Sequence, residues 1–246
     1  MRAAFRDRAT LVSFDLKGHG TSGAARTHEG ATIEGCARDA TLALDESGVG
    51  RAVVFGFSMG CQIALEMSRL DRHRVGAYVL ALGAYEHPFR TVLHGKLGSA
   101  PKAVIGKVPT ALVRGSLRLG KAAMKLEIMH GLAQRASLVG LQTSHARMAP
   151  FYAHMGDIDA ATWIDLARSA ADHSAANILE NVNAPSLVIT GGRDTLTPPH
   201  VGRSMAARIP GSEYVELPAA THTGLLDEST AIVGATHRFL ARHDFV

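Results

Sequence analysis

The residues Gly56-Phe57-Ser58-Met59-Gly60 lie between an apolar segment with strand character, 51–55, and a segment with the pattern of a helix, 61–70. A serine on a tight turn between a strand and a helix is typical of a nucleophile elbow, which exposes the hydroxyl at the top of a sheet. We expect the glycines two residues before and after Ser58 to leave room where the strand and the helix crowd together. The pentapeptide therefore predicts a nucleophilic serine, with a simple turn residue as the alternative.

Segments with strand character alternate with helical segments along most of the chain, except over about 84–172, where the strand pattern is absent. The expected strands are 9–14, 51–55, 75–82, 186–190 and 213–217, and the expected helices are 32–46, 60–70, 199–209 and 230–241. This alternation predicts an α/β fold with a mostly parallel sheet and helices on both faces. Residues 1–83 and 173–246 would form the core, and 84–172 a helical lid inserted after the strand that ends near residue 82.

Three polar residues follow three of the expected strands: Ser58, Asp194 and His222. Ligands of a parallel α/β sheet bind beyond the carboxyl ends of its strands, so these side chains are expected to meet there. A serine hydroxyl needs a base to take its proton, and the base needs an anion to orient it, so the set supplies all three roles. Glu86, past the end of another strand, is the alternative acid. Asp194 as a helix cap and His222 as a surface histidine are the structural alternatives.

Four stretches together resemble the α/β-hydrolase superfamily, in its esterase- and lactonase-like branch with a helical lid. They are FDLKGHGTSG (14–23), the elbow, GGRDTLTPP (191–199) and the His222 loop before LLDE (225–228). The resemblance implies Ser58 as nucleophile, His222 as general base and Asp194 as the orienting acid. It also implies a small-molecule acyl substrate, no metal and no organic cofactor. For His19 it implies a structural role in a loop beside the site.

The oxyanion hole is only partly identifiable from the sequence. The backbone N–H of Met59 is the expected first donor. In the resembling family, an earlier strand leads into a His-Gly-type loop that gives the second donor, and the sequence before 9–14 is too short for the first strands and that loop. We therefore assign no second donor. A longer natural protein is the favoured explanation, ahead of a replacement loop or a shortened, weakly active product.

Composition narrows the class of protein. Hydrophobic residues make up 46% and charged residues 20% of the chain, which is typical of a soluble globular protein. Cys36 and Cys61, both in expected helices, are interpreted as buried free thiols. Without an N-terminal apolar run, a cytoplasmic location is expected. Aromatic residues are only 5% and no nucleic-acid-reading motif occurs, so nucleic acid is not an expected partner.

Basic residues are concentrated in the middle of the chain. Residues 84–150 carry 10 Lys/Arg against 2 Asp/Glu, whereas 151–246 carry 6 against 11. Within the middle segment, residues 111–128 would place Arg114, Arg118, Lys121 and Lys125 on one face of an amphipathic helix. That face is either simply solvated or associates weakly with anionic lipid surfaces or acidic substrates.

The residues therefore predict a serine hydrolase that cleaves a carboxylic ester, a lactone or a related acyl compound through an acyl-enzyme. The incomplete oxyanion hole motivates an alternative from another class, a non-catalytic or weakly active small-molecule receptor that uses the hydrolase pocket. Carbon–carbon bond hydrolysis and cofactor-free perhydrolysis use the same triad, so the sequence leaves them open as well.

Overall fold

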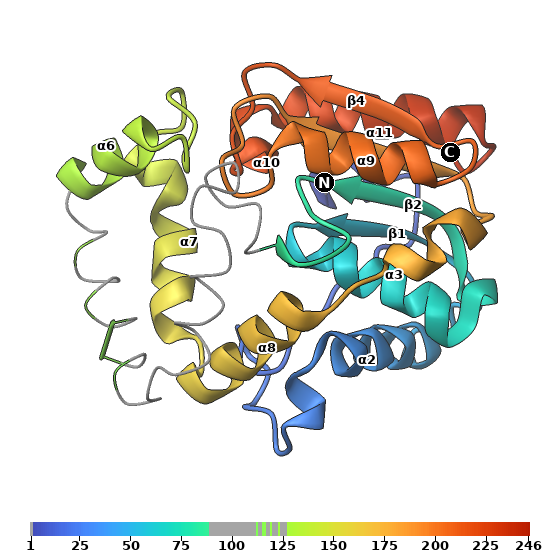
Figure 1. The fold of residues 1–246 in the computed structure, drawn as a ribbon, viewed down its shortest axis with the longest axis horizontal. Coiled ribbons are helices and arrows are strands. Elements are labelled where there is room, and N and C mark those ends of the chain that lie inside the picture. Colours follow the sequence, from blue (N-terminus) through green and yellow to red (C-terminus); the bar gives the residue numbers. More distant parts are fainter. Residues whose placement is uncertain (1, 89–111, 113–114, 117–118, 120–122, 124–126) are drawn as a thin grey trace.

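The computed structural model describes residues 2–88, 112, 115–116, 119, 123 and 127–246. Within them, four strands form one parallel sheet in the order β1 (Ala52–Phe57), β2 (Val75–Ala81), β3 (Ser186–Gly191) and β4 (Glu213–Leu217). The register runs from Phe55 to Val79, from Val79 to Leu187 and from Leu187 to Glu213. The predicted parallel α/β sheet is thus confirmed (Figure 1).

Helices cover both faces of this sheet. The helices α2 (Ile33–Glu46), α3 (Met59–Asp71) and α9 (Pro199–Arg208) pack on the face that receives Tyr78 and Leu80 of β2. The helix α11 (Ser229–Arg242) packs on the opposite face, which receives Val79 and Ala81. All residues of β2 are buried, because alternate side chains of a strand point to opposite faces and both faces are covered here.

The four helices predicted over 32–46, 60–70, 199–209 and 230–241 each agree with an observed helix to within a few residues. The remaining elements are α1 (Arg2–Phe5), η1 (Glu29–Ala31), η2 (Arg72–Arg74), α6 (Glu127–Arg135), α7 (His145–Asp157), α8 (Ala160–Asp172), η5 (Ala176–Asn181) and α10 (Gly224–Asp227). The start of α2 is capped by Thr32, whose hydroxyl accepts a hydrogen bond from the N–H of Gly35 at 2.9 Å.

The predicted strand over 9–14 is wrong, because residues 10–16 adopt no regular secondary structure. A strand exists only where a neighbour accepts and donates its backbone hydrogen bonds. A groove of about 680 Å³ is lined both by residues 9–14 and by Ala52–Phe55 of β1, among others. This segment therefore lies near β1 without pairing with it, and among the described strands β1 pairs only with β2.

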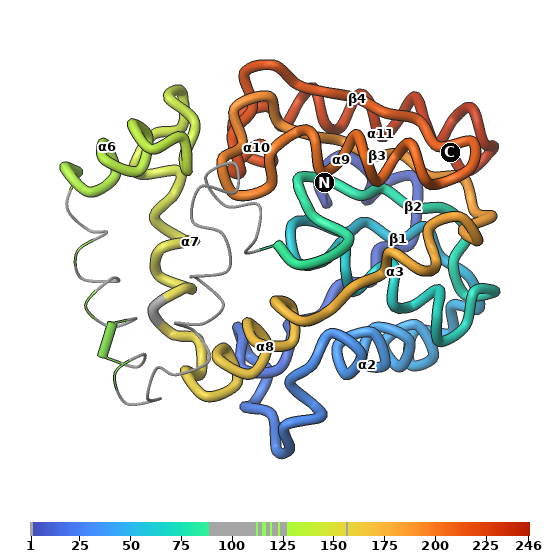
Figure 2. Tube along the Cα trace, in the orientation of Figure 1, coloured from blue at the N-terminus to red at the C-terminus, as the bar shows by residue number. Residues whose placement is uncertain are grey.

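The interval 84–172 contributes helices and no strand in the part that the structure describes. The helices α6 and α7 lie to one side of the sheet, and α8 lies between them and α2 (Figures 1 and 2). Leu166 and Ala170 of α8 belong to the same hydrophobic cluster as α2 and α3. The basic residues Arg114, Arg118, Lys121 and Lys125 fall outside the described residues. No described helix is both long and apolar enough to cross a bilayer.

The two cysteines are free and buried, as expected. Cys36 lies in α2 and Cys61 in α3, and both side chains belong to the cluster between these helices and the sheet. Burial raises the pKa of each thiol to about 12, because the thiolate would lose its hydration. At neutral pH both therefore act as small apolar core residues.

Candidate active site

Ser58 occupies the sharp turn between β1 and α3. Its backbone has φ 53° and ψ −119°, a region that residues with a Cβ rarely adopt and that costs about 1–3 kcal/mol. The turn is held in place because the N–H of Ser58 donates to Ala81 O at 3.0 Å and the N–H of Cys61 donates to Ser58 O at 3.0 Å. A strained serine on a turn between a strand and a helix is the backbone conformation that a nucleophile elbow requires.

The two glycines of the elbow differ in their surroundings. A Cβ at Gly56 would lie 2.5 Å from the carbonyl oxygen of Gly60, whereas a Cβ at Gly60 would meet nothing within 4 Å. The expectation that both glycines leave room is therefore right for Gly56 and wrong for Gly60. The contribution of Gly60 is its backbone, which is the group that a Cβ at position 56 would meet. Gly83, two residues after β2, packs closely against the turn, because a Cβ there would lie 2.4 Å from Ser58 O.

We expect Gly56→Ala to lower the free energy of unfolding by about 1–3 kcal/mol, because its methyl group would press on the backbone of α3. The matched control is Gly60→Ala, which meets open space and should change stability by less than about 1 kcal/mol. Urea denaturation monitored by circular dichroism would measure both. Equal stabilities for the two variants would contradict this account of the elbow.

The three predicted catalytic side chains lie within hydrogen-bond distance of one another. Ser58 follows β1, Asp194 follows β3 and His222 follows β4, so all three lie beyond the carboxyl ends of the sheet. Ser58 Oγ is 2.9 Å from His222 Nε2, and His222 Nδ1 is 2.9 Å from Asp194 Oδ2. A carboxylate only accepts, so Nδ1 carries the proton and Nε2 is free to accept from the serine hydroxyl.

Asp194 is almost fully buried, with 1% of its surface exposed. Its Oδ1 accepts hydrogen bonds from the N–H groups of Leu196 and Thr197, each at 2.8 Å. Its Oδ2 accepts from the Thr197 hydroxyl at 2.7 Å as well as from His222. These hydrogen bonds replace those to the water that the buried carboxylate has lost, and they fix the carboxylate beside the imidazole. The role of Thr197 was not anticipated from the sequence, although the loop 191–199 was.

Glu86 lies elsewhere. Its Oε2 accepts a hydrogen bond from the Ser174 hydroxyl at 2.8 Å, and the two residues also form an isolated β-bridge. The Nδ1 atom of His222 is already paired with Asp194. The structure therefore brings Asp194, and not Glu86, to the histidine.

Asp227 holds the loop that carries His222, a role that the sequence did not indicate. Its Oδ2 accepts hydrogen bonds from the hydroxyls of Thr221 and Thr223, at 2.7 and 2.9 Å. The Thr143 hydroxyl also donates to Asp227, and Gly140 N–H donates to Thr223 Oγ1 at 3.1 Å. The residues on both sides of His222 are therefore tied to the connection between α6 and α7.

A pocket of about 200 Å³ opens beside Ser58. Its lining is largely apolar and comes from the sheet edge, from α3 and from α8: Met59, Ala84, Trp163, Leu166, Ala167, Ala170 and Leu196, among others. The polar side chains that line it besides Ser58 and His222 are His19, Gln62 and Thr197. The position of α8 explains why part of the interval 84–172 contributes to this pocket.

His19 lies in the wall of this pocket as well as in the loop where it was expected. Its Nδ1 lies 3.0 Å from Lys17 O, so Nδ1–H donates to that carbonyl and holds the loop. Its ring centroid is 5.6 Å from that of His154. The resemblance implies a structural role for His19 in a loop beside the site, and the contact with Lys17 O agrees with that role. It does not indicate that His19 lines the pocket. Met59, whose N–H is the expected first oxyanion donor, lies at the start of α3 and also lines the pocket. No second oxyanion donor is assigned.

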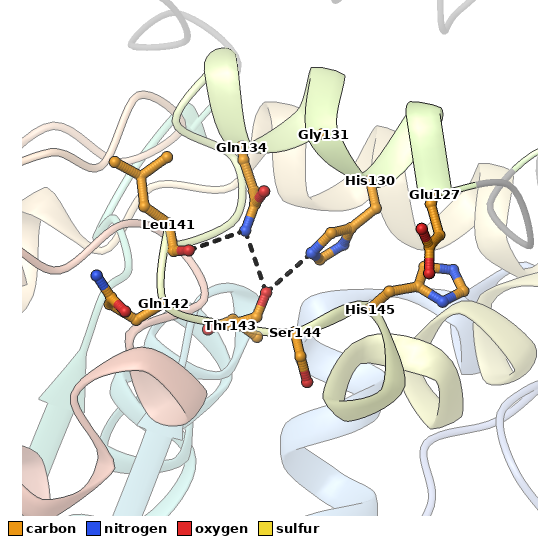
Figure 3. Close-up of a pocket in the computed structure, with 9 residues that line it drawn as sticks. All are labelled: Glu127, His130, Gly131, Gln134, Leu141, Gln142, Thr143, Ser144 and His145. Atoms are coloured by element: carbon orange, nitrogen blue, oxygen red, sulfur yellow. Dashed lines mark hydrogen bonds between the residues drawn. The ribbon is translucent and has the colours of Figure 1, made fainter.

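A second pocket, of about 400 Å³, lies between α6 and the start of α7 (Figure 3). Several of its polar groups are hydrogen-bonded to one another. Thr143 O accepts from His130 Nε2 at 2.8 Å and from Gln134 Nε2 at 3.1 Å, and the Tyr152 hydroxyl lies 2.9 Å from His130 Nδ1. Burial raises the pKa of the Tyr152 phenol, which keeps the hydroxyl protonated as a donor. These contacts are those of a structural network.

One group of potential metal ligands occurs among the described residues: Glu34, Glu66 and His173, whose donor atoms lie within 4.8 Å of one another. Both ring nitrogens of His173 are engaged, Nε2 with Glu66 Oε2 at 3.0 Å and Nδ1 with Gln62 Nε2 at 3.2 Å. Arg69 bonds to the same Glu66 oxygen at 3.1 Å. The guanidinium already supplies the positive charge that a cation would bring, so the contacts are those of a buried ion-pair network.

The sequence model of the alpha/beta hydrolase fold matches residues 1–229. The chain belongs to that family. This alpha/beta hydrolase is 26% identical over 231 residues to a pimeloyl-[acyl-carrier protein] methyl ester esterase of Neisseria meningitidis serogroup A, an alignment covering 94% of this chain and 68% of that protein. Esterases among its relatives agree with an enzyme of the carboxylic ester hydrolase type.

Solved structures share the architecture of this alpha/beta hydrolase. A hydrolase from Oleispira antarctica superposes with a TM-score of 0.75 at 18% identity, covering 98% of this chain and 84% of that one. The enol-lactonase from Burkholderia xenovorans LB400 superposes with a TM-score of 0.66 at 24% identity, covering 92% and 79%. At these identities the similarity shows the fold alone.

Proposed function

We propose that this alpha/beta hydrolase cleaves a carboxylic ester, a lactone or a related acyl compound, with Ser58, His222 and Asp194 as its catalytic triad. The observation that carries the proposal is the continuous line of hydrogen bonds from Ser58 Oγ through both nitrogens of His222 to Asp194 Oδ2, each 2.9 Å long. At its Ser58 end, this line of hydrogen bonds reaches a pocket in which an acyl group has room to bind.

In the first half of the reaction, Ser58 Oγ attacks the carbonyl carbon while its proton passes to His222 Nε2. The buried Asp194 carboxylate stabilises the imidazolium that forms. The backbone N–H of Met59 donates to the developing oxyanion, and removing one such donor typically lowers turnover by about 10²–10³-fold. His222 then gives the proton to the leaving alcohol oxygen as the C–O bond breaks, and the acyl group stays on Ser58.

In the second half, water attacks the acyl-enzyme and loses its proton to His222. The ester bond to Ser58 breaks, the carboxylic acid leaves, and Ser58 Oγ regains its proton. The small, largely apolar pocket favours a short, uncharged acyl group. The division into a core, 1–83 and 173–246, and a lid, 84–172, is part of the proposal and is supported by Trp163 and Leu166, which line the pocket from α8.

The partners and the location proposed for the enzyme rest on the sequence. We propose a cytoplasmic enzyme with a small-molecule substrate and no nucleic-acid partner. Association of the basic segment 111–128 with anionic lipid also stays a prediction.

Turnover of 4-nitrophenyl esters of increasing acyl length by the purified protein tests the proposed activity. We expect hydrolysis of short-chain esters, with kcat/KM falling as the acyl chain outgrows the pocket. Ester binding without turnover would instead support the receptor alternative. Cleavage of a carbon–carbon bond in a β-diketone, or peracid formation from hydrogen peroxide and a carboxylic acid, at higher kcat/KM than ester hydrolysis would reassign the reaction while keeping the triad.

A further inference from the structure

The amide of Gln62 is buried at the wall of the Ser58 pocket and is held from one side. Gln62 lies in α3, one helical turn beyond Ser58, and only 1% of its surface is exposed. Its Nε2 lies 3.0 Å from Ala170 O and 3.2 Å from His173 Nδ1. A carbonyl oxygen only accepts, so the amide nitrogen, and not the amide oxygen, faces Ala170.

The neighbouring ion pair fixes this orientation further. His173 Nε2 lies 3.0 Å from the buried carboxylate of Glu66, which only accepts, so Nε2 carries the proton. In the neutral ring Nδ1 is then an acceptor, which matches the Gln62 N–H. Turning the amide over would place its oxygen against two acceptors, Ala170 O and His173 Nδ1. The network of Glu66 and His173 therefore holds the Gln62 amide in one orientation.

The oxygen of this amide has no partner among the described residues. Gln62 Oε1 is buried, and buried polar atoms of native proteins are almost always hydrogen-bonded. Gln62 lines the Ser58 pocket together with mostly apolar residues, including Ala84, Leu166 and Ala170. An oriented acceptor in an apolar wall discriminates strongly, because a ligand without a matching donor leaves it unpaired.

We infer that Gln62 Oε1 accepts a hydrogen bond from the acyl part of the substrate, which makes Gln62 a specificity-determining residue. The preferred acyl group carries a donor, a hydroxyl or an amide N–H, close to the carbonyl that Ser58 attacks. This inference rests on the proposed function, because it assigns the acyl group of that same reaction. The donor requirement separates the substrate from plain alkyl esters, which the apolar lining alone would favour.

Matched pairs of 4-nitrophenyl esters test the inference. The first pair is the 3-hydroxybutyrate and the 3-methylbutyrate ester, in which a methyl group replaces the hydroxyl. The second pair is the N-acetylglycinate and the 4-oxopentanoate ester, in which CH₂ replaces the amide N–H. We expect the enzyme to prefer the donor-bearing member of at least one pair by roughly 10- to 100-fold in kcat/KM. A preference within the first pair indicates a hydroxyl donor in the substrate, and a preference within the second pair indicates an amide N–H.

Gln62→Met, which keeps the side-chain length and removes the acceptor, should reduce that preference to about 1. The ratio of two esters in one preparation cancels any loss of folded enzyme. If Gln62→Met does not fold, Gln62→Asn replaces it in the test, because the side chain is one methylene shorter and its amide oxygen lies farther from the substrate. The matched control is Gln134→Met, the same substitution in α6, where the amide bonds to Gly140 O and Thr143 O and does not line the Ser58 pocket.

The inference is overturned if the unmodified enzyme shows no preference within either pair. It is also overturned if the preference persists in Gln62→Met or Gln62→Asn, or if Gln134→Met removes it equally. Failure of the proposed function looks different, because then none of the four esters is hydrolysed above the uncatalysed rate. Hydrolysis of all four esters at similar kcat/KM leaves the proposed function intact and removes only the role of Gln62.

Discussion

Ser58→Ala is expected to lower kcat for a short-chain nitrophenyl ester by about 10⁴–10⁶-fold, with little change in KM. The substitution removes the atom that attacks the carbonyl and leaves the pocket lining in place. The fold should survive, because alanine keeps the backbone of the elbow and the buried neighbours of Ser58 do not depend on its hydroxyl. Steady-state kinetics alongside a circular dichroism spectrum would separate lost chemistry from lost structure.

The same reasoning predicts non-additivity within the triad. His222→Ala should lower kcat by a similar factor. The double variant Ser58→Ala with His222→Ala should have a kcat close to that of either single variant, because the two residues act as one unit. A loss below about 100-fold for Ser58→Ala would mean that another nucleophile carries the reaction.

The second large effect is expected for Asp194→Asn, which should lower kcat by about 10⁴-fold. Asparagine nearly matches aspartate in shape, but its amide N–H can face His222 Nδ1 and favour the tautomer that places the proton on Nε2. That ring could not accept the serine proton. Asp194 also accepts from Leu196, Thr197 and the Thr197 hydroxyl, so thermal denaturation should accompany the kinetics to correct for a loosened loop.

Glu86→Gln is the matched control, because it makes the same change from carboxylate to amide at the alternative acid. Glu86 bonds to Ser174 and not to the histidine, so kcat should stay within a few-fold of the unmodified enzyme. A larger loss for Glu86→Gln than for Asp194→Asn would reverse the assignment of the acid.

The sequence indicated the parts of this fold that depend on local pattern. The strand over 75–82 is predicted because its apolar run shows no alternation, as expected of a strand covered on both faces, and β2 is indeed buried throughout. The elbow is predicted because strand, turn and helix are contiguous around Ser58. Ser58, Asp194 and His222 could be brought together in advance because each follows a strand of a parallel sheet, and such strand ends share one edge. The prediction of a strand over 9–14 is wrong for the opposite reason. Its strand character is local, but a strand needs a partner, and partners are set by tertiary structure.

The residues that the sequence did not reveal act through tertiary contacts. Gln62 reads as an ordinary helix residue, and only the packing of α8 against α3 places Ala170 and His173 beside its amide. Asp227 reads as a helix-terminal acid, yet it bonds to the two threonines that flank His222. Contacts between residues this far apart in the chain, as between positions 62 and 173, leave no periodic signal in the sequence.

The central claim is that Ser58 is a nucleophile activated by His222. Incubation with a fluorophosphonate, followed by intact-mass and peptide mass spectrometry, tests it most directly. The account predicts one adduct per chain, located on Ser58, with labelling abolished in Ser58→Ala and slowed by orders of magnitude in His222→Ala. An unlabelled Ser58 in a folded enzyme, or an adduct that persists in Ser58→Ala, would contradict it.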